Sequence, residues 1–205
     1  MTVSKQVAKS LLEIKAVQIR TKNYFTWTSG IKSPIYCDNR LTMSYPDVRK
    51  QIIQAFKEKV LALDVQPDII AGCATAGIPH ASWLAYELDL PLVYVRSTPK
   101  GHGKGNQIEG HVSEGDRVVL IEDLISTGGS ALDAAKALKE VGASVDKVLA
   151  IFTYGLSKSV DQFKAAQMPY DTITNYDHLL QLLLEEGKIS EEEKSELQLW
   201  RNRLT

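Results

Sequence analysis

Short apolar runs recur along the chain and alternate with stretches whose apolar residues fall at helical spacing. The runs that predict buried strands lie at 68–71, 90–95, 117–121, 147–154 and 170–174. Amphipathic helices are expected between most of them, for example at 79–88 and from near Ala131 to 141. Because strands and helices alternate, the pattern predicts an α/β fold with a parallel sheet, right-handed crossovers and helices on both faces.

The chain is expected to have two parts. Residues 1–60 contain an irregular segment and a helix that Ser44 is expected to cap, and they predict a small N-terminal hood with flanking helices. Residues 61–205 predict the sheet core with C-terminal helices, the last of which opens with a capping box of Ser190 and Glu193.

Composition narrows the class of protein. A formal charge of −1 over 205 residues argues against broad electrostatic binding to nucleic acid or to an anionic membrane. No apolar run approaches the roughly 18 residues of a membrane span, and the lysine-interrupted N-terminus does not resemble a signal peptide. Two cysteines without paired spacing predict neither a disulfide framework nor a structural metal site. We therefore expect a cytoplasmic protein.

The stretch "VVLIEDLISTGGS" at 118–130 is the strongest chemical signal in the chain. Its hydroxyls and glycines at 127–130, at the start of a helix, are typical of a phosphate cradle. Glu122 and Asp123 would repel a phosphate unless they face something else, and the vicinal hydroxyls of a ribose are suitable donors to carboxylates. The alternative is a solvated loop followed by an ordinary turn. The combination favours a sugar phosphate, with a divalent cation nearby.

A second signal is a glycine-rich cationic segment at 96–104, which has no acidic residue until Glu109. Such a segment is usually a solvated surface loop. In a chain that also holds a phosphate cradle, it suits a flexible lid over a leaving pyrophosphate.

Three stretches in this order resemble one known family. "VVLIEDLISTGGS" is similar to the phosphoribosyl-diphosphate motif of type I phosphoribosyltransferases. "SGIKSPIYCDNR" at 29–40 and "VRSTPKGHGKGNQIEG" at 95–110 resemble the hood segment and catalytic loop of orotate phosphoribosyltransferases, especially the form of Gram-positive bacteria. The resemblance covers essentially the whole chain. It implies transfer of ribose 5-phosphate from phosphoribosyl diphosphate to N1 of orotate, a step of de novo pyrimidine (UMP) biosynthesis.

The resemblance also implies roles for individual residues. Arg96, Lys100 and His102 are expected to bind the diphosphate, with Lys100 stabilising the leaving group and His102 as a candidate proton donor. The expected ribose and 5-phosphate residues are Glu122, Asp123, Leu124, Ile125, Ser126, Thr127, Gly128, Gly129 and Ser130. The expected orotate residues are Ser126, Tyr36, Cys37, Lys32 and Arg40. For Lys32, Asp38 and Arg40 a structural ion pair is an equal alternative.

Mg²⁺ is expected as the cofactor, bridged by substrate oxygens and water near Asp123 without direct protein ligands. The resemblance further implies a homodimer whose two active sites are shared between subunits. Thr28, Ala76 and Ser97 stand where enterobacterial relatives have lysines, and the segment "FTYGLSK" lacks the arginine that those relatives have there. The sequence therefore does not identify the residue that holds the orotate carboxylate. A transferase for another base and a non-enzymatic regulator on the same fold are the alternatives.

Overall fold

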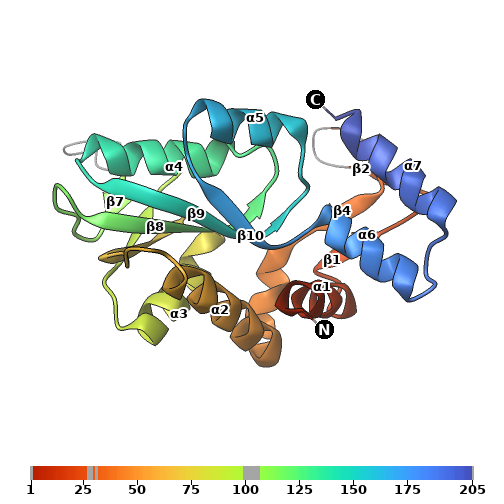
Figure 1. Ribbon diagram of the computed structural model, residues 1–205, viewed down its shortest axis with the longest axis horizontal. Helices are drawn as coiled ribbons and strands as arrows, with labels where there is room; N and C mark the ends of the chain where they lie inside the picture. The colour runs from red at the N-terminus through yellow and green to blue at the C-terminus, as the bar shows by residue number, and fades with distance from the viewer. Residues whose placement is uncertain (1, 27–29, 31, 99–106, 205) are drawn as a thin grey trace.

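The computed structural model describes residues 2–26, 30, 32–98 and 107–204, and its centre is a sheet of six strands (Figure 1). In spatial order these are β10 (Tyr170–Asn175), β9 (Ser144–Thr153), β8 (Arg117–Ile125), β5 (Ile69–Cys73), β6 (Leu92–Val95) and β7 (Ile108–Glu109). Neighbouring strands are parallel except for β7, which is antiparallel to β6. The predicted α/β class with a parallel core sheet is confirmed.

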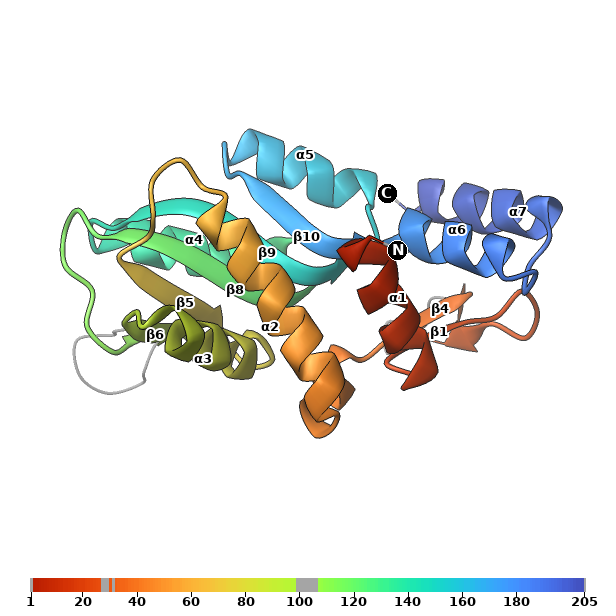
Figure 2. The same cartoon turned by 60° about the horizontal axis from the view of Figure 1, so that its bottom comes forward.

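Helices cover both faces of this sheet (Figures 1 and 2). One face carries α4 (Gly129–Glu140) and α5 (Ser157–Ala165), and the other carries α1 (Val3–Glu13), α2 (Pro46–Leu61) and α3 (Gly77–Leu88). Because successive strand residues point to opposite faces, Val119 and Ile121 of β8 enter the apolar cluster with α2 and α3, whereas Val118 and Leu120 enter the cluster with α4. No helix in the described ranges is long and apolar enough to cross a membrane.

The hood is built from short elements beside the carboxyl end of the sheet. In it β1 (Val17–Ile19) pairs with β4 (Ile35–Cys37), β2 (Phe25–Thr26) pairs with β3 (Lys32–Ser33), and a 3-10 helix, η1 (Asn39–Ser44), follows. The C-terminal helices α6 (Tyr176–Glu185) and α7 (Glu191–Asn202) lie next to it, and Trp200 Nε1 donates to the Lys32 carbonyl at 3.1 Å. Helix α2 packs into the same apolar cluster as α3, and the division of the chain at residue 60 stays a prediction.

The predicted elements differ from the observed ones at their ends. Strand β8 continues past its predicted end to Ile125, where it still pairs with Thr153 of β9. Glu122 and Asp123 therefore belong to the last residues of β8, where the strand is still paired with β9, and not to a loop after it. Helix α4 begins at Gly129, slightly earlier than the pattern predicts.

One predicted helix cap is wrong and another is confirmed. Ser44 ends η1, and α2 begins at Pro46 after Tyr45, which makes no side-chain cap hydrogen bond. Pro46 suits this position because its fixed φ is helical and its missing N–H needs no partner in the first turn. The capping box of α7 is present, since the Ser190 and Glu193 side chains each accept a hydrogen bond from the other's backbone N–H.

Candidate active site

Two acidic residues lie near the carboxyl end of β8, in the middle of the sheet. Glu122 is buried, with 6% of its surface exposed, and its Oε1 accepts a hydrogen bond from the Asp123 backbone N–H at 2.9 Å. Burial raises the pKa of both carboxyls, and the adjacent Asp123 charge raises that of Glu122 further. Ionising both carboxyls at this site without a partner is unfavourable, so the site favours a ligand that donates hydrogen bonds or carries positive charge.

The turn after β8 has the geometry of an anion cradle. Gly128 has φ of +92° and immediately precedes α4, and a Cβ there would lie 2.7 Å from Phe163 Cε2. No side chain caps the N-terminus of α4, which leaves its first backbone N–H groups available. A Cβ at Gly129 would meet nothing within 4 Å, so the space in front of this backbone is open. With the exposed Thr127 and Ser130, the turn can surround a phosphate with donors.

The residues between the acids and the cradle mainly support the strand. Ile125 packs into the core, and its carbonyl accepts a hydrogen bond from Thr153 Oγ1 at 2.9 Å. Leu124 packs against the apolar cluster on the other face of the sheet, which contains residues of α2 and α3. Ser126 is half-buried at the start of the turn. These residues fix where the acids and the cradle stand relative to each other.

The hood strand β4 lies beside the same acids. Burial raises the pKa of the Cys37 thiol, and the Asp123 charge adds to this effect. Burial likewise raises the pKa of the Tyr154 hydroxyl, with further contributions from Cys37 and Asp123. Tyr36 is 39% exposed at the neighbouring position of β4. Cys37 of the hood and Asp123 of β8 are therefore near each other, and the contact of Tyr36 and Cys37 with orotate stays a prediction.

Three charged hood residues that were considered as orotate contacts, Lys32, Asp38 and Arg40, already have hydrogen-bond partners. Arg40 donates to Asp38 through Nε at 2.6 Å and through Nη2 at 2.9 Å, and this pairing lowers the pKa of the Asp38 carboxyl. Lys32 Nζ donates to Thr26 Oγ1 at 2.8 Å within the hood hairpin. The structural ion pair that the sequence left open is thus present for Asp38 and Arg40, and an orotate contact for Lys32 or Arg40 stays a prediction.

The base of the cationic segment is closed by paired strands. The Arg96 backbone N–H donates to the Gln107 carbonyl at 2.9 Å, and Gln107 Nε2 donates back to the Arg96 carbonyl at 2.8 Å. The Arg96 guanidinium lies 3.5 Å from a Glu109 carboxylate oxygen. Lys100 and His102 lie outside the described residues, so their predicted catalytic roles stay predictions.

Two residues near the acids were missed by the sequence reasoning. Cys73 ends β5, its pKa is raised by burial and by Glu122, and its Sγ lies 3.7 Å from the Ser130 carbonyl oxygen. Asn39 donates from Nδ2 to the Asp123 carbonyl at 2.7 Å. Neither has a spacing signal, because each meets its partner only through the fold, and the predicted strand at 68–71 ends two residues before Cys73.

Comparisons with known proteins agree with this geometry. A family model for the phosphoribosyl transferase domain matches residues 42–176. The protein of Oceanobacillus iheyensis named orotate phosphoribosyltransferase is 61% identical over 98% of this chain and 100% of its own length. The protein of the same name from Halalkalibacterium halodurans is 56% identical over 95% of this chain and 93% of its own length.

A solved structure is similar over nearly the same extent. The crystal structure of orotate phosphoribosyltransferase from Aeropyrum pernix superimposes with a TM-score of 0.75 at 28% identity, covering 90% of this chain and 99% of the other. Sequence relatives, structural likeness and the arrangement of acids and cradle lead to one family. The chain belongs to the phosphoribosyltransferase family, in its orotate phosphoribosyltransferase branch.

Proposed function

We propose that the protein transfers ribose 5-phosphate from 5-phosphoribosyl 1-diphosphate to N1 of orotate, forming orotidine 5′-phosphate and pyrophosphate. The reaction would serve de novo pyrimidine biosynthesis in the cytoplasm. The observation that carries the proposal is that the buried Glu122 carboxyl and the half-buried Asp123 carboxyl lie next to a phosphate cradle within residues 122–130. The names of relatives at 52–61% identity over nearly the whole chain support orotate as the acceptor.

The ribose phosphate fits this edge of the sheet by its chemistry. The 5-phosphate would accept hydrogen bonds from the turn at 127–130 and from the first N–H groups of α4. The two ribose hydroxyls would donate to Glu122 and Asp123, which relieves the cost of keeping these carboxyls charged in a buried place. Both contacts would fix the anomeric carbon relative to the hood.

Catalysis would then rest on position and charge rather than on a covalent nucleophile. Displacement at an anomeric carbon develops positive charge on the sugar and negative charge on the departing diphosphate. Arg96, Lys100 and His102 would bind that diphosphate, with Lys100 neutralising its developing charge and His102 as proton donor. Orotate would lie against the hood at Tyr36 and Cys37, with Ser126 as a further contact.

We expect Mg²⁺ as the cofactor, because this cation binds diphosphate oxygens. Within the described ranges, no three histidine, cysteine, aspartate or glutamate side chains gather closely enough to hold an ion. We expect the ion to arrive with the diphosphate, and Asp123 would be the protein carboxylate near it. Bound there, Mg²⁺ would supply positive charge that neutralises the diphosphate and ribose oxygens.

The choice of base is tested by direct competition. The protein is incubated with phosphoribosyl diphosphate and Mg²⁺, and the loss of orotate absorbance is compared with the loss of uracil, hypoxanthine or adenine. We expect turnover of orotate and little turnover of the other three. Turnover of another base with none of orotate would overturn the proposed acceptor while leaving the family assignment intact.

A further inference from the structure

The inner side of η1 carries polar side chains that are removed from water. Asn39 and Thr42 are 1% and 0% exposed, and His80 of α3, which faces them, is 1% exposed. Asn39 Nδ2 donates to the Asp123 carbonyl at 2.7 Å, and Thr42 Oγ1 donates to the Asn39 carbonyl at 2.6 Å. His80 Nε2 lies 3.4 Å from Thr42 Oγ1. The four residues form a buried polar chain from α3 to the ribose acid.

Only one assignment of donors and acceptors satisfies the hydrogen bonds that link Asp123, Asn39, Thr42 and His80. The Asp123 carbonyl can only accept, so the Asn39 side chain must present its NH₂ group to it. The single hydroxyl proton of Thr42 is used on the Asn39 carbonyl, so the Thr42 oxygen accepts from His80. His80 must then carry its proton on Nε2, which agrees with the lack of a partner for Nδ1 among the described residues. Burial lowers the pKa of His80 to about 4, which keeps the ring neutral near pH 7.

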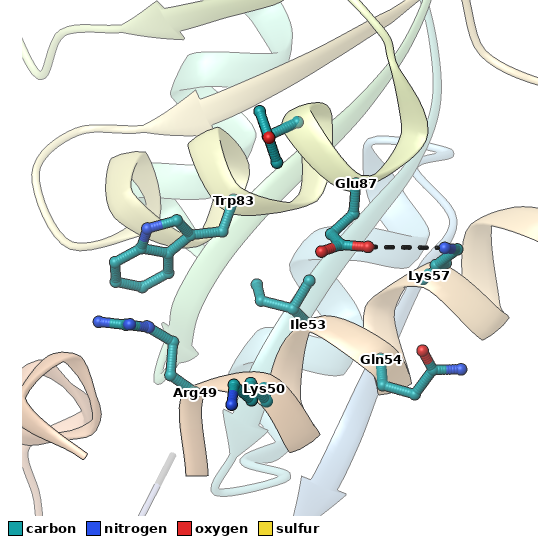
Figure 3. A pocket seen from close by; sticks show the side chains of 8 residues that line it. Arg49, Lys50, Ile53, Gln54, Lys57, Trp83 and Glu87 are labelled. Atoms are coloured by element: carbon teal, nitrogen blue, oxygen red, sulfur yellow. Dashed lines mark ion pairs between the residues drawn. The ribbon is translucent and has the colours of Figure 1, made fainter. Parts of the chain in front are cut away.

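The outer end of the chain is held by packing. The Trp83 ring meets the His80 ring edge to face at 5.5 Å between centroids, and the Arg49 guanidinium lies 4.6 Å above the Trp83 ring. Arg49 and Trp83 line a groove between α2 and α3 with a volume of about 430 Å³. Figure 3 shows their side chains at one end of the lining residues. Arg49 also donates to the Met43 carbonyl of η1 at 3.2 Å. Both helices thus fix η1 from outside while Asn39 fixes it from inside.

We propose that Asn39 is a positioning residue that sets the hood against the ribose-binding strand, and that Thr42 and His80 hold Asn39 in place. The inference rests on the proposed function. Asn39 follows the hood strand that ends at Cys37, and its partner is the backbone of Asp123. In the proposed function the hood would face the base and β8 would face the ribose, so this bond would set the distance between the two reactants.

The expected effect of losing this bond falls on the chemical step. Each half of the site would keep its own ligand, while the base and the anomeric carbon would lose alignment. Misplacement by about 1 Å costs on the order of 100-fold in rate. We therefore expect Asn39→Ala to lower kcat by about 10- to 100-fold, and to change the Kd of phosphoribosyl diphosphate by less than about threefold.

Matched variants separate positioning from a general loss of stability. Thr42→Val removes the hydroxyl that holds Asn39 without touching Asn39, and we expect a smaller loss of kcat in the same direction. Thr42→Ser keeps the hydroxyl and should retain wild-type kcat. Thr174→Val makes the same exchange at another fully buried threonine, whose Oγ1 has no partner among the described residues, and should leave kcat unchanged.

The measurements are kcat and KM for both substrates, calorimetric binding of phosphoribosyl diphosphate with Mg²⁺, and thermal melts of every variant. A folded Asn39→Ala protein with wild-type kcat would overturn the proposal, as would a loss of diphosphate binding as large as the loss of kcat. If Asn39→Ala does not fold, the comparison of Thr42→Val with Thr42→Ser decides in its place.

The tautomer of His80 tests the assignment of donors and acceptors in this buried polar chain separately. Nitrogen-15 NMR of the imidazole ring should find the proton on Nε2 and none on Nδ1 near neutral pH, and the opposite tautomer would contradict the chain. Failure of the proposed function is distinguishable from failure of this inference. If the wild-type protein turns over a different base, the same variants are measured with that base.

Discussion

Glu122 is a residue whose ionisation opposes folding. Burial keeps its pKa above the ordinary value of 4.5, so the folded protein holds a proton that the unfolded chain has already released. In that pH window the folded state binds more protons than the unfolded state, and stability therefore falls as pH rises. A ribose or a cation at the site relieves this cost, which links ligand binding to stability.

Replacing Glu122 with Gln should therefore stabilise the substrate-free protein while lowering its activity. The amide cannot ionise, and its oxygen can still accept the hydrogen bond from the Asp123 N–H. We expect little difference in Tm from wild type at about pH 5 and an increase of at least about 2–4 °C at about pH 8. Thermal melts across this range test the prediction, with the exposed Glu140→Gln variant as a control that should show no such trend. A Tm difference that does not grow with pH would contradict it.

At the scale of the element, the two glycines at the start of α4 differ in backbone conformation and in the space around them. Gly128 needs its positive φ and has Phe163 against it, whereas Gly129 has ordinary helical geometry and open space in front. The first position is constrained by the fold of the protein itself. The second is free of such constraint, and its openness is what a phosphate close to the backbone would require.

The two glycines should respond differently to substitution by alanine. Gly128→Ala should destabilise the protein by about 1–3 kcal/mol, because the strained φ and the contact with Phe163 both oppose a methyl group. Gly129→Ala should leave Tm near that of wild type and raise the KM for phosphoribosyl diphosphate by at least about tenfold, since the methyl group enters the space proposed for the phosphate. Thermal melts and steady-state kinetics on both variants test this. An unchanged KM for Gly129→Ala would remove the 5-phosphate from that position.

At the scale of the whole molecule, the acids lie on β8, whereas the base of the cationic segment lies at the ends of β6 and β7, and β5 separates β8 from β6 in the same sheet. The resemblance to orotate phosphoribosyltransferases implies that the segment of one subunit serves the site of its partner in a homodimer. A two-fold dimer then contains two sites, each assembled from parts of both chains. This arrangement stays a proposal for the present chain.

Mixing two inactive variants tests the shared site. Lys100→Ala removes the proposed leaving-group lysine and Asp123→Asn removes a ribose acid, so each should be nearly inactive alone. Refolded together in equal amounts, half of the dimers are mixed and one of their two sites is intact, which should restore about a quarter of the wild-type activity. Native mass spectrometry establishes that mixed dimers are present, and each variant refolded alone is the control. Mixed dimers without recovered activity would show that each segment serves its own subunit.

Local patterns were sufficient for much of the fold and for the cradle. The strand runs, the capping box at Ser190 and the turn at 127–130 follow from residues that interact with near neighbours in sequence. The cap at Ser44 was predicted wrongly because η1 uses that residue, and Pro46 starts α2 without a side-chain cap. The choice between an ion pair and a ligand contact for Arg40 needed the observed geometry, since both alternatives have the same residue types.

The sequence by itself determined the α/β class, the order of its elements and the presence of acids beside an anion cradle, because periodicity and turn chemistry act over a few residues. Only the tertiary structure decided that Glu122 is buried with a raised pKa, and that Asn39 bonds to Asp123 across 84 positions. Burial and such long-range bonds depend on which distant segments pack together. That packing is a property of the whole chain, and no local pattern encodes it.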